Sequence, residues 1–246
     1  MKVSIITVTY NSEKYLTSCI NSVLNQTYKD IEYIIIDGSS SDNTINIINN
    51  FGKKINKFIT EPDVGLYDAI NKGIKTSTGE IIGLLHSDDY FYNNFIIEMI
   101  VNSFNNNIDC VYANSFFINS VNGNKTRFYF SGNFNKKTIK YGLMPSHPTM
   151  YFKREVLIKY PLYNLNYKIA ADFDLVLRHL LLYNTKMFFV NKIWVIMREG
   201  GISTNGFKSK IDISKQILKI CKANGLKTNY FFINFRLLYK LLYTFK

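Results

Sequence analysis

Cysteine, proline and long apolar runs are scarce in this chain of 246 residues. The three cysteines, Cys19, Cys110 and Cys221, are odd in number, far apart and without CxxC spacing, so a disulfide framework or a cysteine zinc site is not expected. The 4 Pro and 13 Gly are too few for a collagen-like or linker-dominated chain. The first apolar stretch is too short for a signal peptide, and no uninterrupted apolar run reaches the length of about 18 residues that predicts a spanning helix. We therefore expect a protein of the reducing cytoplasm.

The composition that remains is that of a packed globular protein. Hydrophobic residues make up 47%, aromatic residues 15% and charged residues 20% of the chain, which excludes an intrinsically disordered polymer. A chain of this length buries roughly 70–75% of its unfolded surface, so its core needs no disulfide or metal to hold it. One domain with an appendage is the expected organisation.

The formal charge of +12 is unevenly distributed. Residues 208–246 hold nine Lys or Arg and a single acid, Asp212, whereas residues 1–207 carry only +4. Basic groups form no stripe along a predicted strand or helix, as a nucleic-acid phosphate footprint requires. Nucleic-acid binding is therefore rejected as the main function, and the basic balance belongs to the tail.

Short apolar strands alternate with amphipathic helices in the first half of the chain. This alternation predicts a parallel sheet with right-handed crossovers, in which ligands lie at the carboxyl ends of the strands. The expected strands are 3–8, 31–36, 58–60 and 80–85, and the expected helices are 15–24, 44–51 and 65–74.

The pattern changes after Asp89. A helix over 95–104 precedes two strands, 110–118 and 125–130, which an Asn122-Gly123 turn joins into a β-hairpin. A helix over 172–183 and two short strands, 187–190 and 194–197, are expected beyond it.

Three carboxylates follow the ends of predicted strands. Asp37 comes directly after the second strand, and Asp88 and Asp89 follow the fourth, so all three should converge on one edge of the sheet. Carboxylate oxygens that share a site with substrate phosphates suit Mg²⁺ or Mn²⁺. The alternative is that Asp88 and Asp89 only cap the following helix.

Several segments, taken in order, resemble a known family. They are 3–11 (VSIITVTYN), 22–27 (SVLNQT), 36–44 (IDGSSSDNT) and 61–74 (EPDVGLYDAINKGI), followed by Gly79-Glu80 and Ser87-Asp88-Asp89. They resemble the opening of the family 2 inverting glycosyltransferases of the bacterial polysaccharide or lipid-linked oligosaccharide type. The resemblance covers roughly the first 110 residues and thins afterwards to 171–175 with Arg178.

The resemblance implies a GT-A fold of the α/β class, with a mainly parallel, Rossmann-like sheet flanked by helices. It implies sugar transfer, with inversion, from a nucleotide-diphosphate sugar to a saccharide or lipid-linked saccharide hydroxyl, and a UDP-sugar is expected first. Mg²⁺ or Mn²⁺ would bridge the diphosphate. The implied site residues are Thr9, Tyr10, Asn11 and Asp37 for base and ribose, Asp63 near the donor, Asp88 near the ribose, Asp89 for the metal, and Asp172 as the catalytic base.

Three departures from the family pattern bear on these roles. The family often has two acids where this chain has Asp37-Gly38, which concerns base recognition. His86 holds the first position of the acidic D-x-D pattern, which leaves the metal to Asp89 with Asp88 in support. Ala171 replaces the Glu that commonly precedes the base, which keeps Asp174 open as the alternative to Asp172.

A carboxylate base has a physical reason in this chemistry. The acceptor hydroxyl is a poor nucleophile and must lose its proton as it attacks. Asp172 begins a predicted helix, whose dipole keeps a carboxylate ionised. A simple N-terminal helix cap is the other interpretation of Asp172.

Other polar residues leave two interpretations open. His147, between Pro145 and Pro148, is either a ligand for diphosphate or metal or a structural loop residue. The segment 200–203 (GGIS) either offers backbone N–H groups to phosphate or forms an ordinary turn. Asp68 falls within a predicted helix and is expected to be structural, and Trp194 is expected in the core.

The basic tail predicts a second kind of partner. Apolar residues alternate with lysines over 209–223, and 230–246 mixes aromatic rings with Lys and Arg, which is typical of an interfacial helix on anionic lipid. A peripheral position on the inner face of the cell membrane is expected. The alternative is a helix packed on the body or in a homodimer interface.

The expected division is a nucleotide-sugar half (1–110), an acceptor half of the same catalytic domain (111–207) and the basic helical tail (208–246). A sugar nucleotidyltransferase is one rival, but such enzymes usually open with a Gly-rich, basic loop where this chain has Thr9-Tyr10-Asn11-Ser12. A non-catalytic sugar-nucleotide-binding relative is the other, and the presence of Asp88, Asp89 and Asp172 argues against it.

Overall fold

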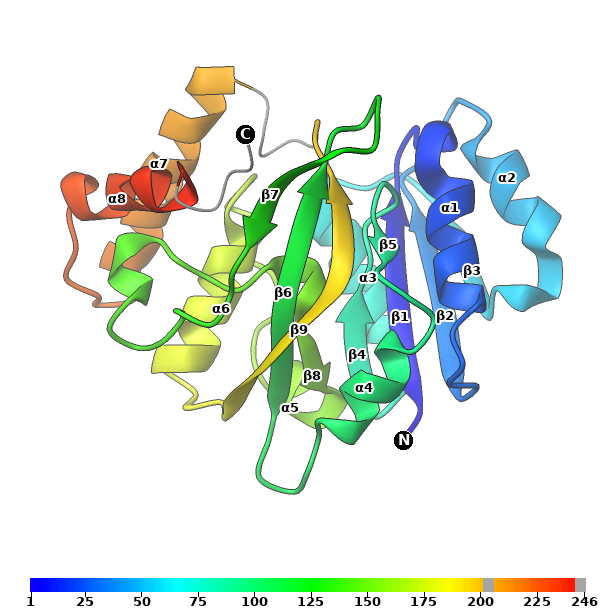
Figure 1. Cartoon of the computed structure of the whole chain (residues 1–246), viewed down its shortest axis with the longest axis horizontal. Helices are drawn as coiled ribbons and strands as arrows, with labels where there is room; N and C mark the ends of the chain where they lie inside the picture. Colours follow the sequence, from blue (N-terminus) through cyan, green and yellow to red (C-terminus); the bar gives the residue numbers. More distant parts are fainter. Residues whose placement is uncertain (201–205, 242–246) are drawn as a thin grey trace.

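A computed structural model describes residues 1–200 and 206–241 as a single mixed sheet with helices on both faces (Figure 1). The strands lie in the order β3-β2-β1-β4-β8-β6-β9-β5, and β7 pairs with β6 beside this path. Their bounds are β1 Val3–Thr9, β2 Ile31–Asp37, β3 Lys57–Thr60, β4 Ile81–Leu84, β5 Tyr90–Phe91, β6 Cys110–Ile118, β7 Lys125–Tyr129, β8 Tyr151–Lys153 and β9 Met187–Arg198.

The first half is the predicted parallel sheet. Strands β3, β2, β1 and β4 all run parallel, and the helices between them are α1 (Glu13–Leu24), α2 (Thr44–Phe51) and α3 (Leu66–Thr76). Strand β8 then pairs antiparallel with both β4 and β6, so β6 again runs in the direction of β4. The expected α/β fold class is confirmed.

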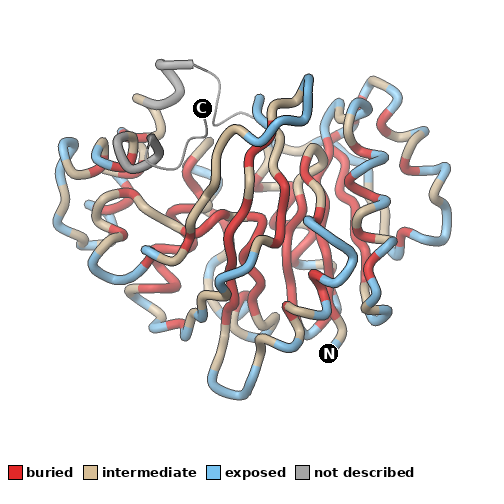
Figure 2. The backbone as a smooth tube through the Cα atoms, viewed as in Figure 1, coloured by how far each residue is buried: buried red, intermediate tan, exposed pale blue. Residues whose placement is uncertain are grey.

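Alternation along the strands divides the core into two layers. Ile6, Val8, Ile34 and Ile36 point to the face covered by α3 and by α6 (Ala171–Leu181), while Val3, Ile5, Tyr33 and Ile35 point to the face covered by α1 and by α4 (Ile96–Asn102). In Figure 2 the central strands are accordingly buried along nearly their whole length. Trp194 lies fully buried in the second layer, as expected.

The tail folds as two helices, α7 (Gly206–Ala223) and α8 (Tyr230–Leu241), so its predicted helical character is confirmed (Figure 1). Helix α7 packs on α6, and α8 packs on α7 and on the short helix η2 (Ile139–Tyr141). Ile217, Ile220 and Ile233 are buried in this contact. One face of the tail is therefore part of the body. Within the described residues, no helix is long and apolar enough to cross a membrane.

Three elements differ from the sequence prediction. The two strands expected at 187–190 and 194–197 form one strand, β9, because the residues between them are absorbed as irregularities in its pairing with β6 rather than breaking it. The two-residue β5 and the six-residue helix α5 (Arg154–Lys159) were not predicted, since neither is long enough to show a period. The predicted hairpin at 110–130 is confirmed as β6 and β7.

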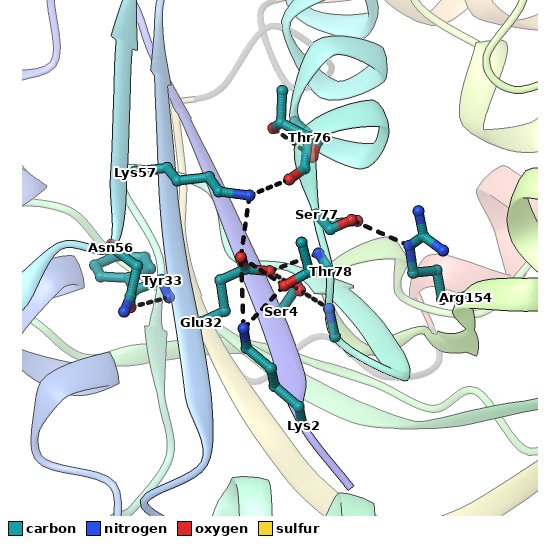
Figure 3. A network of polar contacts seen from close by, with 12 residues as sticks. Lys2, Ser4, Glu32, Tyr33, Asn56, Lys57, Thr76, Ser77, Thr78 and Arg154 are labelled. Carbon is teal, nitrogen blue, oxygen red and sulfur yellow. Dashed lines mark hydrogen bonds and ion pairs between the residues drawn. The ribbon is translucent and has the colours of Figure 1, made fainter.

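Glu32 connects several segments at the amino-terminal ends of the parallel strands (Figure 3). Its buried carboxylate accepts hydrogen bonds from the Ser4 hydroxyl at 2.6 Å and the Thr78 backbone N–H at 2.7 Å, and pairs with Lys57 at 3.1 Å. Burial acts to raise the pKa of Glu32, but these bonds outweigh it and lower the pKa to about 2.

Candidate active site

The carboxyl ends of β1 and β2 meet as predicted. Thr9 and Asp37 are register partners in the parallel pair, and the Thr9 hydroxyl donates to Asp37 Oδ1 at 2.8 Å. The chain that leaves β4 runs along the same edge, because the Leu85 N–H donates to the Ile6 carbonyl and Asp88 and Asp89 follow three residues later. Residues far apart in the sequence thus form one polar edge.

Asp37 is a fully buried organiser of the loop after β2. Besides the bond from Thr9, its carboxylate accepts bonds from the Ser40 N–H at 2.9 Å, the Ser40 hydroxyl at 2.5 Å and the Thr60 hydroxyl at 2.8 Å. Asp37 therefore fixes the shape of the loop on which the neighbouring exposed residues are presented.

The two residues after Thr9 lie on the surface of this edge. Tyr10 is 67% exposed, and Asn11 adopts a positive φ of 48°. The Asn11 N–H donates to the Ser40 hydroxyl, and its side-chain oxygen accepts from the Ser41 N–H, both at 2.9 Å. Tyr10 is therefore presented by a backbone that is held on both sides.

Asp89 is buried and only half satisfied. Its Oδ1 accepts the Arg198 backbone N–H at 3.2 Å, whereas its Oδ2 has no hydrogen-bond partner among the described residues. Burial, with the charge of Asp88 beside it, raises the pKa of Asp89 well above its ordinary value. Asp88 is partly exposed. A cation bound beside this oxygen would stabilise the negative charge of the buried carboxylate.

The residues here would supply only part of a metal's ligands. In the described part of the chain, no group of three or more His, Cys, Asp or Glu side chains is placed to hold a metal. Mg²⁺ and Mn²⁺ sites often use one or two carboxylates together with substrate phosphates. Asp89 with its orphaned oxygen fits that kind of shared site.

Arg198 is a residue of this edge that sequence reasoning missed. Its guanidinium lies over the rings of Tyr15, 4.4 Å from the centroid, and Tyr90, at 4.8 Å, and donates to the Asp88 carbonyl. The Arg198 backbone N–H also donates to Asp89, so Arg198, at the end of β9, is hydrogen-bonded to both acids. The only sequence signal was a charged residue ending an otherwise apolar strand.

Asp172 is the second residue of α6, close to its predicted position. Burial raises its pKa to about 6, against the lowering effects of the Phe173 N–H, 2.7 Å from Asp172 Oδ1, and of the Tyr67 hydroxyl. A carboxyl with this pKa is mostly ionised at pH 7 and still basic enough to accept a proton.

Asp174 has a different environment. It is 2% exposed, and its Oδ2 pairs with Arg178 at 2.9 Å, while Arg178 also donates to the Pro161 and Leu162 carbonyls. This pair ties α6 to the loop before it. The Asp174 carboxylate is thus committed to structure, which favours Asp172 among the two candidates for the base.

His86 and His147 lie ring to ring, 5.7 Å apart. His147 Nε2 is 2.8 Å from the Tyr163 hydroxyl, and burial, with the nearby His86, lowers the pKa of His147 to about 3. His147 is therefore neutral at physiological pH, and its Nε2 is hydrogen-bonded to the Tyr163 hydroxyl. Gly201–Ser203, the other candidate diphosphate contact, lie outside the described residues.

A second missed residue comes from the tail. Arg236 of α8 is 6% exposed, and its Nη2 donates to the Ser214 hydroxyl of α7 at 2.9 Å. Its positive charge contributes to lowering the pKa of Asp172. The tail therefore adds a charge to the surroundings of the candidate base, a contribution that a scan of its amphipathic pattern does not reveal.

Known proteins are similar to this chain over most of its length. The model of the family described as "Glycosyl transferase family 2" matches residues 4–161. A PGL/p-HBAD biosynthesis glycosyltransferase of Mycobacterium bovis is 28% identical over 180 residues, 71% of this chain and 68% of that protein. An uncharacterized glycosyltransferase of Haemophilus influenzae is 29% identical over 238 residues, 94% of this chain and 93% of that protein.

Solved structures share the fold at lower identity. S. aureus TarS 1–349, in complex with UDP-GlcNAc, superposes with a TM-score of 0.68 at 22% identity, over 90% of this chain and 66% of that one. The mannosyltransferase PcManGT of Pyrobaculum calidifontis, in complex with GDP-Man and Mn²⁺, gives 0.68 at 13% identity, over 92% and 65%. Glucosyl-3-phosphoglycerate synthase of Mycobacterium tuberculosis, with Mn²⁺, UDP and phosphoglyceric acid, gives 0.65 at 17%, over 93% and 80%. This chain therefore spans about two thirds of the TarS and PcManGT structures.

Proposed function

The chain belongs to glycosyltransferase family 2, and on that premise we propose that it moves a sugar, with inversion, from a nucleotide-diphosphate sugar to an acceptor hydroxyl. The acceptor is a saccharide or lipid-linked saccharide of a cell-surface polymer. The observation that carries the proposal is the polar edge of the sheet, where Thr9 is bonded to Asp37 and the Ser87 hydroxyl, directly before Asp88-Asp89, donates to the Ser12 hydroxyl after β1 at 3.0 Å. Asp172 supplies the base.

The donor is proposed to be a UDP-sugar held by the half formed by residues 1–110. Tyr10 and Asn11 present the exposed surface for the nucleoside, Asp88 lies near the ribose, and Asp89 holds Mg²⁺ or Mn²⁺. When bound, the divalent ion offsets the negative charge that grows on the leaving diphosphate. Support comes from the orphaned Asp89 Oδ2 and from the UDP, GDP-Man and Mn²⁺ bound in the solved neighbours.

The transfer is a single displacement at the anomeric carbon. The acceptor oxygen forms a bond to that carbon as the bond to the diphosphate oxygen breaks, and the acceptor proton passes to Asp172. Attack from the face opposite the leaving group inverts the anomeric centre. The acceptor half is formed by residues 111–207, and the pKa of about 6 at Asp172 matches the work of a base near neutral pH.

A thermal-shift panel of nucleotide sugars, each with and without Mn²⁺, tests this function. We expect one UDP-sugar to raise the Tm by several degrees in the presence of Mn²⁺, since about 2.7 kcal/mol of stabilisation accompanies a ligand at 100 times its Kd. Nucleoside triphosphates with sugar 1-phosphates serve as the control for a nucleotidyltransferase. Stabilisation by those compounds alone, or by no nucleotide sugar, would contradict the proposal.

The tail is proposed to dock on an anionic membrane surface. Phe231 and Phe235 are 79% and 47% exposed and lie one helical turn apart on α8, with the Phe235 ring also 5.9 Å from the ring of Tyr141 in η2, whereas Ile233 and Arg236 are buried. Exposed rings within a segment, residues 208–246, that carries a net charge of +8 fit the boundary of an anionic bilayer.

Vesicle sedimentation with the double variant Phe231→Ser/Phe235→Ser measures this docking. Wild type should sediment with vesicles that contain anionic lipid and lose binding at high salt, and the double variant should lose about tenfold or more in partitioning, because two buried rings are worth over 1.4 kcal/mol. Phe95→Ser, an exposed ring 57% accessible on α4's amino end, is the matched control. Equal sedimentation of all three proteins would refute the docking.

A further inference from the structure

Tyr67 lies in the first turn of α3 and reaches the start of a different helix, α6. Its side chain is buried, and its hydroxyl donates to the Ile169 carbonyl at 2.6 Å, two residues before α6 begins at Ala171. Burial raises the pKa of Asp172, and hydrogen bonding from the Tyr67 hydroxyl acts in the opposite direction. One phenol group therefore serves both the loop that leads into α6 and the candidate base in its first turn.

The Tyr67 ring is held in place by a second ring. Tyr163 stacks on it, with the ring centroids 5.5 Å apart and the planes 15° apart. Tyr163 is itself tied to α3, because its N–H donates to Asn71 Oδ1 at 3.0 Å and its carbonyl accepts from Asn71 Nδ2 at 2.9 Å. The Tyr163 hydroxyl points to another partner, His147 Nε2, at 2.8 Å. The position of the Tyr67 hydroxyl is therefore fixed by its own helix and by the ring stacked on it.

The other groups around Asp172 do not titrate near pH 6. In the part of the chain that the structure describes, the groups whose charge interacts with Asp172 are Tyr163 of the preceding loop, Tyr129 of β7 and Arg236 of α8. Burial raises the pKa of both tyrosines, and a guanidinium keeps its charge at this pH. Burial also lowers the pKa of His147, on the far side of Tyr163, to about 3. A titration near pH 6 in this region therefore belongs to Asp172.

We propose that Tyr67 is the positioning residue of the base, with its hydroxyl donating to the ionised Asp172 carboxylate and returning to the Ile169 carbonyl when Asp172 has taken the acceptor proton. A phenol has a single proton to donate, and a charged oxygen is the stronger acceptor. Held by this bond, the carboxylate keeps one orientation toward the acceptor hydroxyl. The inference rests on the proposed function, because it assumes that Asp172 is the base.

Carbon-13 NMR of the aspartate carboxyl groups in the full chain tests the contact without any substrate, and Asp172→Asn identifies the signal. Tyr67→Phe keeps the ring that stacks on Tyr163 but removes the donor. Because the ionised form then loses a hydrogen bond, the pKa of Asp172 should rise from about 6 by about one pH unit. Tyr163→Phe is the matched control: it removes a hydroxyl from the same pair of rings, the one bonded to His147, and should leave the titration unchanged.

The pH profile of turnover should carry the same signature. Release of UDP from the UDP-sugar that stabilises the protein, with water as the acceptor and saturating Mn²⁺, gives kcat without a known acceptor. In Tyr67→Phe the acidic limb should move to higher pH by the same amount as the Asp172 titration. On the plateau above that limb kcat should fall about threefold to tenfold, since the carboxylate is no longer held in one orientation. Tyr163→Phe should keep both the limb and the plateau.

The two readouts separate the inference from the function beneath it. A wild type whose Asp172 titrates near pH 6 while its turnover has no acidic limb overturns Asp172 as the base, and the inference with it. A limb that Asp172→Asn removes and Tyr67→Phe leaves in place overturns the inference alone. Lower turnover in Tyr67→Phe with an unshifted Asp172 titration also overturns it, because a merely structural loss gives that result. Circular dichroism melting confirms that both phenylalanine variants are folded.

Discussion

Asp172→Asn should lower kcat by about 10²- to 10⁴-fold, the usual contribution of a positioned general base. The amide keeps the size of the side chain and can still accept the Phe173 N–H, but it cannot take the proton of the acceptor hydroxyl. Donor affinity should remain within a factor of about two, which is under 0.5 kcal/mol, since the change is at the acceptor side. Initial rates of nucleoside diphosphate release and calorimetric donor titration measure the two quantities.

The pH dependence gives this prediction a second signature. Because burial raises the pKa of Asp172 to about 6, the wild-type kcat/KM should fall as the pH drops through about 6, where the base becomes protonated. The residual activity of Asp172→Asn should lack that acidic limb. Asp174→Asn is the matched control, and it should lower the Tm, because it breaks the buried pair with Arg178, while keeping the acidic limb. Normal turnover in Asp172→Asn would move the base elsewhere.

Asp89→Asn should abolish the Mn²⁺-dependent part of donor binding. Wild type is expected to bind the donor at least about tenfold more tightly with Mn²⁺ than without it, a difference of 1.4 kcal/mol or more, and the variant should bind equally in both conditions. The amide oxygen can still accept the Arg198 N–H, and the second oxygen of Asp89 has no bond to lose among the described residues. The Tm of the metal-free variant should therefore not fall.

Titration of the donor with and without Mn²⁺, followed by a melt without metal, measures both parts. Asp109→Asn serves as the control, because Asp109 precedes β6 at the other edge of the sheet and binds the Lys186 N–H. It should retain full Mn²⁺ dependence. A metal-dependent gain that persists in Asp89→Asn would place the metal on other ligands.

The sequence predicted most of the donor half because its signals are local. Strands such as Ile31–Asp37 are buried on both faces and read as continuous apolar runs, and α1 and α3 repeat their apolar positions at helical spacing. Polar residues at the ends of such strands meet by topology alone. This is why Thr9 and Asp37 could be brought together without coordinates.

What the sequence could not predict depends on contacts between distant segments. Arg198 donates a hydrogen bond to the Asp88 carbonyl, which lies 110 residues earlier in the sequence. Arg236 donates to the Ser214 hydroxyl of α7, a contact that the apolar pattern of α8 does not predict. Arg198 ends β9, just past the predicted strand over 194–197, and Arg236 lies in a helix predicted to face lipid, so neither local pattern indicated these contacts. The burial of one tail face follows from packing on α6 and η2, which no local signal encodes.

The three residues of β8 connect two parts of the sheet. Backbone hydrogen bonds in both directions join the donor strands to β6 here, and they place few demands on side chains beyond the fit of Gly83 under the Tyr151 ring. The continuity of the sheet between β4 and β6 thus depends on the pairing of these three residues with Ile81–Gly83 on one side and with Cys110 and Val111 on the other.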